Sequence, residues 1–208
     1  MLLAEPSHAC ALCPRLAAFR AENRAAYPGW HNAPVASFGD VKAWLLIVGL
    51  APGLRGANRT GRPFTGDYAG DLLYRTLGKY GLSTGSYGQS PEDGLCLHGV
   101  MITNAVRCVP PENKPTTAEI HQCRPFLKAR IAALARLKAI LALGTIAHQS
   151  VLRAMEEKPA RHPFAHGAMH RLPSGLVLAD SYHCSRYNTN TGRLTPAMFE
   201  AVFDALLA

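Results

Sequence analysis

Residues 44–74 read WLLIVGLAPGLRGANRTGRPFTGDYAGDLLY. Five apolar residues, from Trp44 to Val48, are closed by Gly49, a pattern typical of a strand buried on both faces. A loop rich in glycine and arginine follows, and Asp67 is placed as an N-cap before leucines at helical spacing. Because ligands of open α/β sheets bind where strands end and helices begin, we expect the functional site in this loop.

The rest of the chain alternates predicted strands with predicted helices. We expect strands near residues 98–105, 138–143 and 176–180, and irregular structure over residues 21–43. Helices are predicted over residues 69–80, 116–135, 145–154 and 195–207. The predicted fold is therefore α/β, a three-layer sandwich with a central, mainly parallel four-stranded sheet flanked by helices. At 208 residues, the chain is expected to form a single domain, residues 1–208.

The charge balance favours a polyanionic partner. The chain carries 22 Lys and Arg against 14 Asp and Glu, a formal net charge of +8. No stretch has the length of a membrane span, and the first ten residues, MLLAEPSHAC, resemble no signal peptide. We therefore expect an intracellular, cytoplasmic protein that binds no membrane.

Four of the six cysteines are spaced like metal ligands. Cys10 and Cys13 form a close pair, and Cys108 and Cys123 form a wider one. A capping box at residues 116–119 predicts a helix that carries Cys123 back toward Cys108. Four thiolates suit either zinc or an iron-sulfur cluster, and this chemistry alone does not separate the two.

The remaining cysteines and a group of histidines have simpler interpretations. We expect Cys96 to be a small core residue and Cys184 a bystander thiol. His162, His166 and His170 recur at regular spacing, but Pro163 and Gly167 argue against a helix. A solvent-facing basic loop that binds no metal is the expectation for this segment.

Three motifs together resemble a known family. GLAPG (residues 49–53), GANRTGRPFTGD (56–67) and SYHCSRYNTNTGRLT (181–195) are similar to motifs of the uracil-DNA glycosylase superfamily, most of all to its family 5, the type-B enzymes. The resemblance implies a repair enzyme that removes uracil, and also hypoxanthine, from double-stranded DNA, and we expect it to act as a monomer. It also implies a 4Fe–4S cluster on Cys10, Cys13, Cys108 and Cys123.

The resemblance also implies roles for individual residues. His183 would stabilise the negative charge that develops on the departing base, by a hydrogen bond to uracil O2. Asn58 and Asn113 would orient water or read the base, Phe64 would stack on it, and the main chain at Ala51 and Gly53 would assist. No carboxylate or amide follows Gly49, as is typical of family 5, and no lysine stands as a nucleophile. A monofunctional glycosylase without lyase activity is therefore predicted.

Basic residues around the motif loops are candidates for DNA contacts. Those expected to bind phosphates are Arg55, Arg59, Arg62, Arg186 and Arg193. Arg186 and Tyr187 are also candidates for wedging into the duplex after the base has left.

Two other interpretations remain open. One is a zinc-stapled nucleic-acid binding module without catalysis, which would be colourless and unable to release bases. The other is a neighbouring class of glycosylase, either family 4 or a relative that becomes covalently attached to DNA through a histidine. Residues 58–67 and 188–195 argue against that second group.

Overall fold

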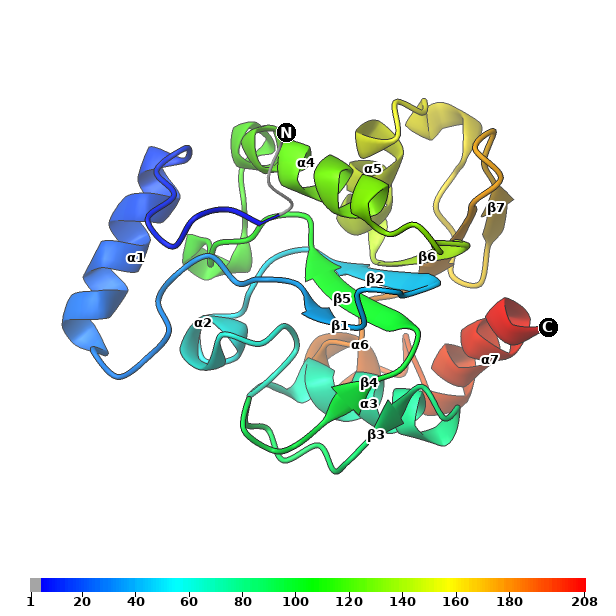
Figure 1. Ribbon diagram of the computed structural model, residues 1–208, viewed down its shortest axis with the longest axis horizontal. Coiled ribbons are helices and arrows are strands. Elements are labelled where there is room, and N and C mark those ends of the chain that lie inside the picture. Colours follow the sequence, from blue (N-terminus) through cyan, green and yellow to red (C-terminus); the bar gives the residue numbers. More distant parts are fainter. Residues whose placement is uncertain (1–4) are drawn as a thin grey trace.

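The computed structural model of the protein describes residues 5–208, which are built around one sheet of six strands (Figure 1). The strand order is β1-β5-β2-β6-β8-β7. Four central strands run parallel: β5 (Val100–Asn104), β2 (Leu45–Gly49), β6 (Ala139–Leu143) and β8 (Val177–Ser181). Two short edge strands are antiparallel, namely β1 (Phe38–Gly39) and β7 (Met169–Arg171). A small separate hairpin joins β3 (Ser83–Thr84) to β4 (Cys96–Leu97).

Each central strand is buried because helices cover both faces of the sheet, as the long apolar runs predict. Leu45 and Ile47 point into one core, against α3 (Tyr68–Lys79) and α7 (Pro196–Leu207). Leu46 and Val48 point into a second core, against α4 (Thr117–Ala133) and α5 (Thr145–Ala154). The three-layer α/β architecture is therefore confirmed, and the two antiparallel edge strands extend the four predicted strands.

The four predicted helices are present with small differences at their ends. The predicted capping box starts α4, because the amide of Glu119 donates to Thr116 Oγ1 at 3.3 Å and the amide of Thr116 donates to Glu119 Oε2 at 2.7 Å. Asp67 occupies the N-cap position of α3, but its side chain makes no capping hydrogen bond. The prediction that Cys96 is a core residue is wrong, because this side chain is exposed on β4.

Several short elements were not expected from the sequence. Helix α1 (Pro14–Ala26) covers part of the predicted irregular segment; it buries only Leu16, Arg20 and Asn23, so it lacks a continuous apolar stripe. The others are α2 (Ala57–Thr60), α6 (Arg186–Asn190) and two 3₁₀ turns, η1 (Pro111–Asn113) and η2 (Pro159–Arg161). Within residues 5–208, no helix is long and apolar enough to cross a membrane.

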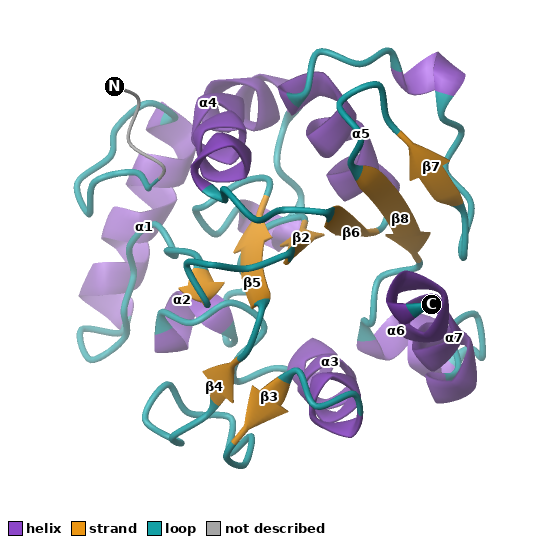
Figure 2. Cartoon of the chain, turned by 45° about the vertical axis from the view of Figure 1, so that its right-hand side comes forward, coloured by secondary structure: helices purple, strands orange, loops and turns teal. Residues whose placement is uncertain are grey.

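The topology brings the motif loops together at the carboxyl ends of the parallel strands, which we call the carboxyl edge of the sheet (Figure 2). Because the central strands are parallel, the segments that follow Gly49, Asn104 and Ser181 all leave from the same edge. These segments carry the residues singled out in the sequence.

Candidate functional site

Phe64 and His183 come together at this edge from distant parts of the chain. Their ring centroids lie 5.8 Å apart with an interplanar angle of 28°. Phe64 is buried and has a positive φ of 52°, which is unusual for an aromatic residue. Gly49 is required beneath it, since a Cβ there would lie 2.6 Å from Phe64 Cζ. The turn therefore holds the Phe64 ring against the end of β2 in a strained conformation.

His183 is electrically neutral near pH 7. It leaves β8 just after the strand ends, and its carbonyl accepts a hydrogen bond from Asn188 Nδ2 at 2.8 Å. The residue keeps some contact with solvent, yet burial of the imidazole lowers its pKa to about 4. A neutral imidazole can donate one N–H to an anionic acceptor without carrying a charge of its own.

Asp67 is a buried carboxylate that the sequence analysis treated only as a helix cap. Its Oδ1 has no hydrogen-bond partner among residues 5–208. Burial raises its pKa, and the nearby amides of Ala69 and Gly70 only partly oppose this effect. A Cβ on Gly56 would lie 2.2 Å from Asp67 Oδ2, so the glycine loop wraps closely around this group. A buried carboxylate that has one oxygen without a hydrogen-bond partner, and that lies beside a loop expected to bind a ligand, is a candidate catalytic base.

The asparagines of the site differ in accessibility. Asn58 is fully buried, and its Nδ2 donates to Asn32 Oδ1 at 2.9 Å, so its contacts are those of a residue that holds two loops together. Asn113 is exposed in a left-handed conformation with a φ of 57°.

Asn104 is a further polar residue of the site, although its place in the sequence indicated only the end of a strand. It is buried at the end of β5. A Cβ on Gly49 would lie 2.5 Å from its Oδ1, which places its amide beside Phe64.

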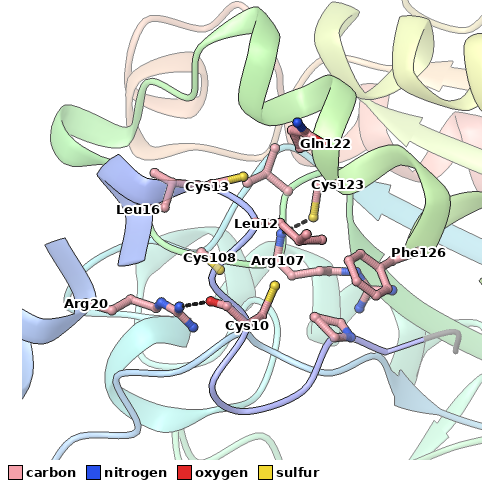
Figure 3. Close-up of a pocket in the computed structure, with 12 residues that line it drawn as sticks. Cys10, Leu12, Cys13, Leu16, Arg20, Arg107, Cys108, Gln122, Cys123 and Phe126 are labelled. Atoms are coloured by element: carbon pink, nitrogen blue, oxygen red, sulfur yellow. Dashed lines mark hydrogen bonds between the residues drawn. The ribbon is translucent and has the colours of Figure 1, made fainter. Parts of the chain in front are cut away.

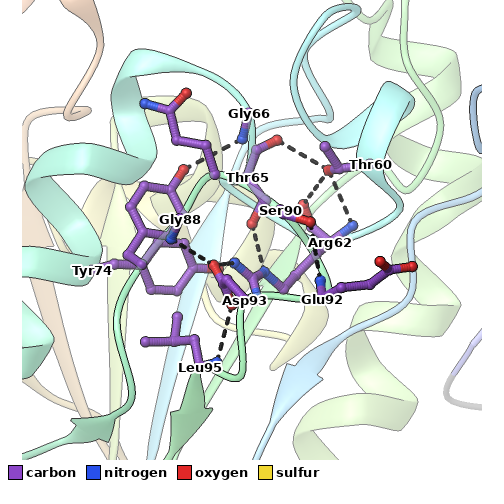
Figure 4. Close-up of polar contacts among 12 residues, drawn as sticks. Thr60, Arg62, Thr65, Gly66, Tyr74, Gly88, Ser90, Glu92, Asp93 and Leu95 are labelled. Carbon is purple, nitrogen blue, oxygen red and sulfur yellow. Dashed lines mark hydrogen bonds and ion pairs between the residues drawn. The ribbon is translucent and has the colours of Figure 1, made fainter.

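Arg62 is a correction to the expected DNA contacts. Its side chain is only 5% exposed, and its two terminal nitrogens bind both carboxylate oxygens of Asp93 at 2.7 and 2.6 Å (Figure 4). Its Nε also donates to Thr65 Oγ1 at 2.7 Å. With every guanidinium nitrogen engaged inside the protein, Arg62 supports the turn that carries Phe64 and does not reach a phosphate.

The other predicted DNA-contacting arginines are exposed. Arg55 and Arg59 line a groove together with Tyr27 and Trp30, whose rings stack 4.0 Å apart. The segment after His183, expected as a loop, forms the helix α6. It presents Tyr187, which is 71% exposed, beside Arg186. Arg193 lies over the ring of Tyr182.

The four predicted cysteine ligands line one pocket (Figure 3). They come from the amino-terminal segment, from the loop after β5 and from α4. The amide of Arg107 donates to Cys123 Sγ at 3.3 Å, and the Arg20 guanidinium donates to the carbonyl of Cys10. Leu16 and Phe126 supply apolar walls.

This pocket fits a group bound by thiolates. Burial raises the pKa of Cys108 to about 12 and that of Cys123 to about 11, because an apolar pocket disfavours the thiolate form. A bound metal ion supplies the positive charge that such thiolates need. The backbone N–H to sulfur contact is also typical of cysteine ligands.

The sequence matches those of known proteins over most of its length. The model of the uracil DNA glycosylase superfamily matches residues 36–207. A type-5 uracil-DNA glycosylase of Thermus thermophilus is 47% identical over 203 residues, covering 95% of this chain and 92% of that protein. A type-5 enzyme of Pyrobaculum aerophilum is 40% identical, covering 89% of this chain and 82% of its own length.

Type-4 relatives match a smaller part of the chain. A type-4 uracil-DNA glycosylase of Archaeoglobus fulgidus is 35% identical over 123 residues, which is 59% of this chain and 54% of that protein. The similarity to type-5 enzymes is thus both higher and longer.

Proposed function

The chain belongs to the uracil-DNA glycosylase superfamily, and on this premise we propose how its residues release a base from DNA. It is a monofunctional uracil-DNA glycosylase, a DNA repair enzyme that hydrolyses the N-glycosyl bond and leaves an abasic site. In our proposal a monomer acts on double-stranded DNA that carries a deaminated base, either uracil or hypoxanthine. The pairing of Phe64 with His183 at the carboxyl edge of the sheet carries this proposal.

The extruded base stacks on Phe64 while His183 contacts its edge. A base cannot enter between the two rings as they stand, since 5.8 Å between centroids is less than the roughly 7 Å that two stacked layers need. The imidazole therefore turns from the face of Phe64 toward O2 of the base. In our proposal the amide of Asn104, which lies beside Phe64, contacts the remaining polar edge of the base together with the main chain at Ala51 and Gly53.

Bond cleavage separates charge, and the site residues stabilise both halves. The electron pair of the N-glycosyl bond leaves with the base, and the neutral N–H of His183 stabilises the resulting anion. Water then adds to the sugar carbon. Asp67 orients this water and accepts its proton, with Asn113 and Asn58 as further candidates for positioning it.

The four cysteines hold a 4Fe–4S cluster in our proposal. Bound there, the cluster supplies structural cross-linking and takes no part in bond cleavage. It would connect the amino-terminal segment to the loop after β5 and to α4 through Cys10, Cys13, Cys108 and Cys123.

Exposed basic side chains around the site bind the DNA in our proposal. The arginines that contact phosphates are Arg55, Arg59, Arg186 and Arg193, and Tyr187 fills the space that the base has left.

The test is base release from a labelled duplex with one uracil opposite guanine, with and without alkali. We expect strand cleavage only after alkali. His183→Ala should lower the rate of base release by about 100-fold or more while duplex binding remains. An unchanged rate in this variant would remove His183 from the mechanism, and cleavage without alkali would contradict the absence of lyase activity. A duplex containing hypoxanthine tests the wider substrate range.

A further inference from the structure

A cluster of histidines and one aspartate lies outside the proposed base site, between α5, β7 and β8. His148 comes from α5, His170 from β7 and Asp180 from β8 (Figure 2). His148 is 1% exposed and Asp180 is fully buried. The expectation of a solvent-facing loop is therefore wrong for His170, whose side chain is only 13% exposed. The sequence pattern did not indicate that His170 lies beside His148 and Asp180, which belong to other elements.

The hydrogen bonds fix where the proton sits on one face of His148. Its Nε2 lies 2.8 Å from the carbonyl oxygen of His162. A carbonyl only accepts, so Nε2 carries a hydrogen and donates it. This bond leaves Nδ1 as the nitrogen that faces the cluster. Metal-binding histidines commonly donate their second N–H to a backbone carbonyl in this way.

The opposite face of His148 also meets an acceptor. Nδ1 lies 2.6 Å from Asp180 Oδ1, which is also an acceptor. Two lone pairs at this distance would repel each other, so a proton lies between them. His170 Nε2 approaches the other oxygen, Asp180 Oδ2, at 3.1 Å. The carboxylate is thus held between two imidazoles.

We propose that His148, His170 and Asp180 form a zinc site that joins α5, β7 and β8. One ligand atom from each residue lies within 4.8 Å of the others, and tetrahedral zinc bonds place such atoms about 3.3 Å apart. Side-chain rotations would bring the more distant atoms together and move His148 Nδ1 and Asp180 Oδ1, now 2.6 Å apart, out to this separation. Two imidazoles and a carboxylate form a donor set that suits Zn²⁺, with water completing the coordination. On binding, Zn²⁺ takes the place of the proton between His148 and Asp180, and that proton leaves to solvent. His170 Nε2, which faces Asp180 Oδ2, binds the ion through its lone pair, so the hydrogen of this imidazole lies on Nδ1 in the zinc-bound form.

The ion has a structural role at this position. Asp180 is the second-to-last residue of β8, three positions before His183. Without an ion, a proton shared by His148 and Asp180 links only α5 and β8, while His170 adds one hydrogen bond from β7. Zinc replaces these contacts by three coordinate bonds. The segment that delivers His183 is then fixed more tightly than by hydrogen bonds alone.

Zinc titration of the intact, iron-loaded protein tests this site. Zn²⁺ is added at low micromolar concentration, excess ion is removed, and zinc and iron per chain are measured in the same sample. Iron that stays constant distinguishes the new site from exchange at the cysteines. We expect one equivalent of zinc and a higher melting temperature in the parent protein. His170→Gln should bind Zn²⁺ at least about 100-fold more weakly, because it lacks a direct ligand.

His121→Gln is the matched control. His121 is an exposed histidine on α4, so this variant should bind zinc as the parent does. Equal zinc content and equal thermal response in the parent and in His170→Gln would overturn the proposal.

Nitrogen NMR of the histidines in the parent protein gives a second test that needs no variant. Saturation with Zn²⁺ should remove the proton from His148 Nδ1 and leave the one on Nε2. Retention of the Nδ1 proton would assign the cluster to a buried hydrogen-bond network and overturn the zinc site.

Discussion

Asp67 combines a proposed catalytic role with a cost to stability. Burial raises its pKa, so the folded protein holds the Asp67 proton more tightly than the unfolded chain does. As pH rises through this raised pKa, the folded state acquires a buried charge that water no longer solvates. The free energy of unfolding therefore falls over this pH range, and the cost remains at neutral pH.

We predict that Asp67→Asn lowers base release and raises the melting temperature. The amide keeps the shape of the side chain but cannot accept the proton of water, so the rate should fall by about 100-fold or more. Removing the buried charge should stabilise the fold. Single-turnover kinetics and thermal unfolding measure the two effects. Asp71→Asn is the control, since Asp71 lies on the same helix and its Oδ1 accepts a hydrogen bond from the exposed Gln89. A rate equal to that of the parent would exclude Asp67 as the base.

At the scale of elements, the turn over residues 61–66 depends on an ion pair with a distant loop. Arg62 also lies over the rings of Phe38 and Tyr74, at 5.1 and 5.5 Å from their centroids. Its guanidinium holds the pKa of Asp93 well below the usual range. Because the folded pKa is depressed, this stabilisation is present above the ordinary aspartate pKa and is lost only as pH falls toward the depressed value.

We predict that Arg62→Met destabilises the protein by about 3–5 kcal/mol, because it leaves Asp93 buried without its partner. Denaturant unfolding measures this loss. Arg59→Met is the matched control from the same motif, and its exposed side chain should contribute little to stability. Arg59→Met should instead weaken duplex binding and reduce the salt slope by about one. If Arg62→Met weakened DNA binding without loss of stability, Arg62 would be a phosphate contact after all.

At the scale of the whole molecule, the cysteine pocket connects the amino-terminal segment to the sheet. Cys108→Ser should lower iron content and visible colour. We expect the melting temperature to fall by roughly 10 °C, since each lost kcal/mol lowers it by about 2–4 °C in a chain of this size. Iron analysis and thermal unfolding measure both changes. Cys96→Ser is the control, because Cys96 is exposed and lies outside the pocket. Full retention of iron in Cys108→Ser would refute the ligand assignment.

The sequence alone determined the parts of this protein that depend on local pattern. The patterns at residues 44–48 and 138–143 predicted strands of a parallel sheet, which the structure has at residues 45–49 and 139–143, and the capping box at Thr116 predicted where α4 begins. The cysteine spacing and the three motifs pointed to the four proposed ligands and to Phe64 and His183. Each of these signals lies within a few consecutive residues or is carried by residue types with few alternative uses.

Only the tertiary structure decided which polar groups are buried and what they face. Arg62 looked like its exposed neighbours until Asp93, 31 residues away, was found beside it. His148 and Asp180 are 32 residues apart, and no local period connects them. Asp67 looked like a helix cap until the glycine loop was seen to enclose it. Local patterns report the burial that a segment prefers, whereas hydrogen-bond partners and desolvation depend on how distant segments pack.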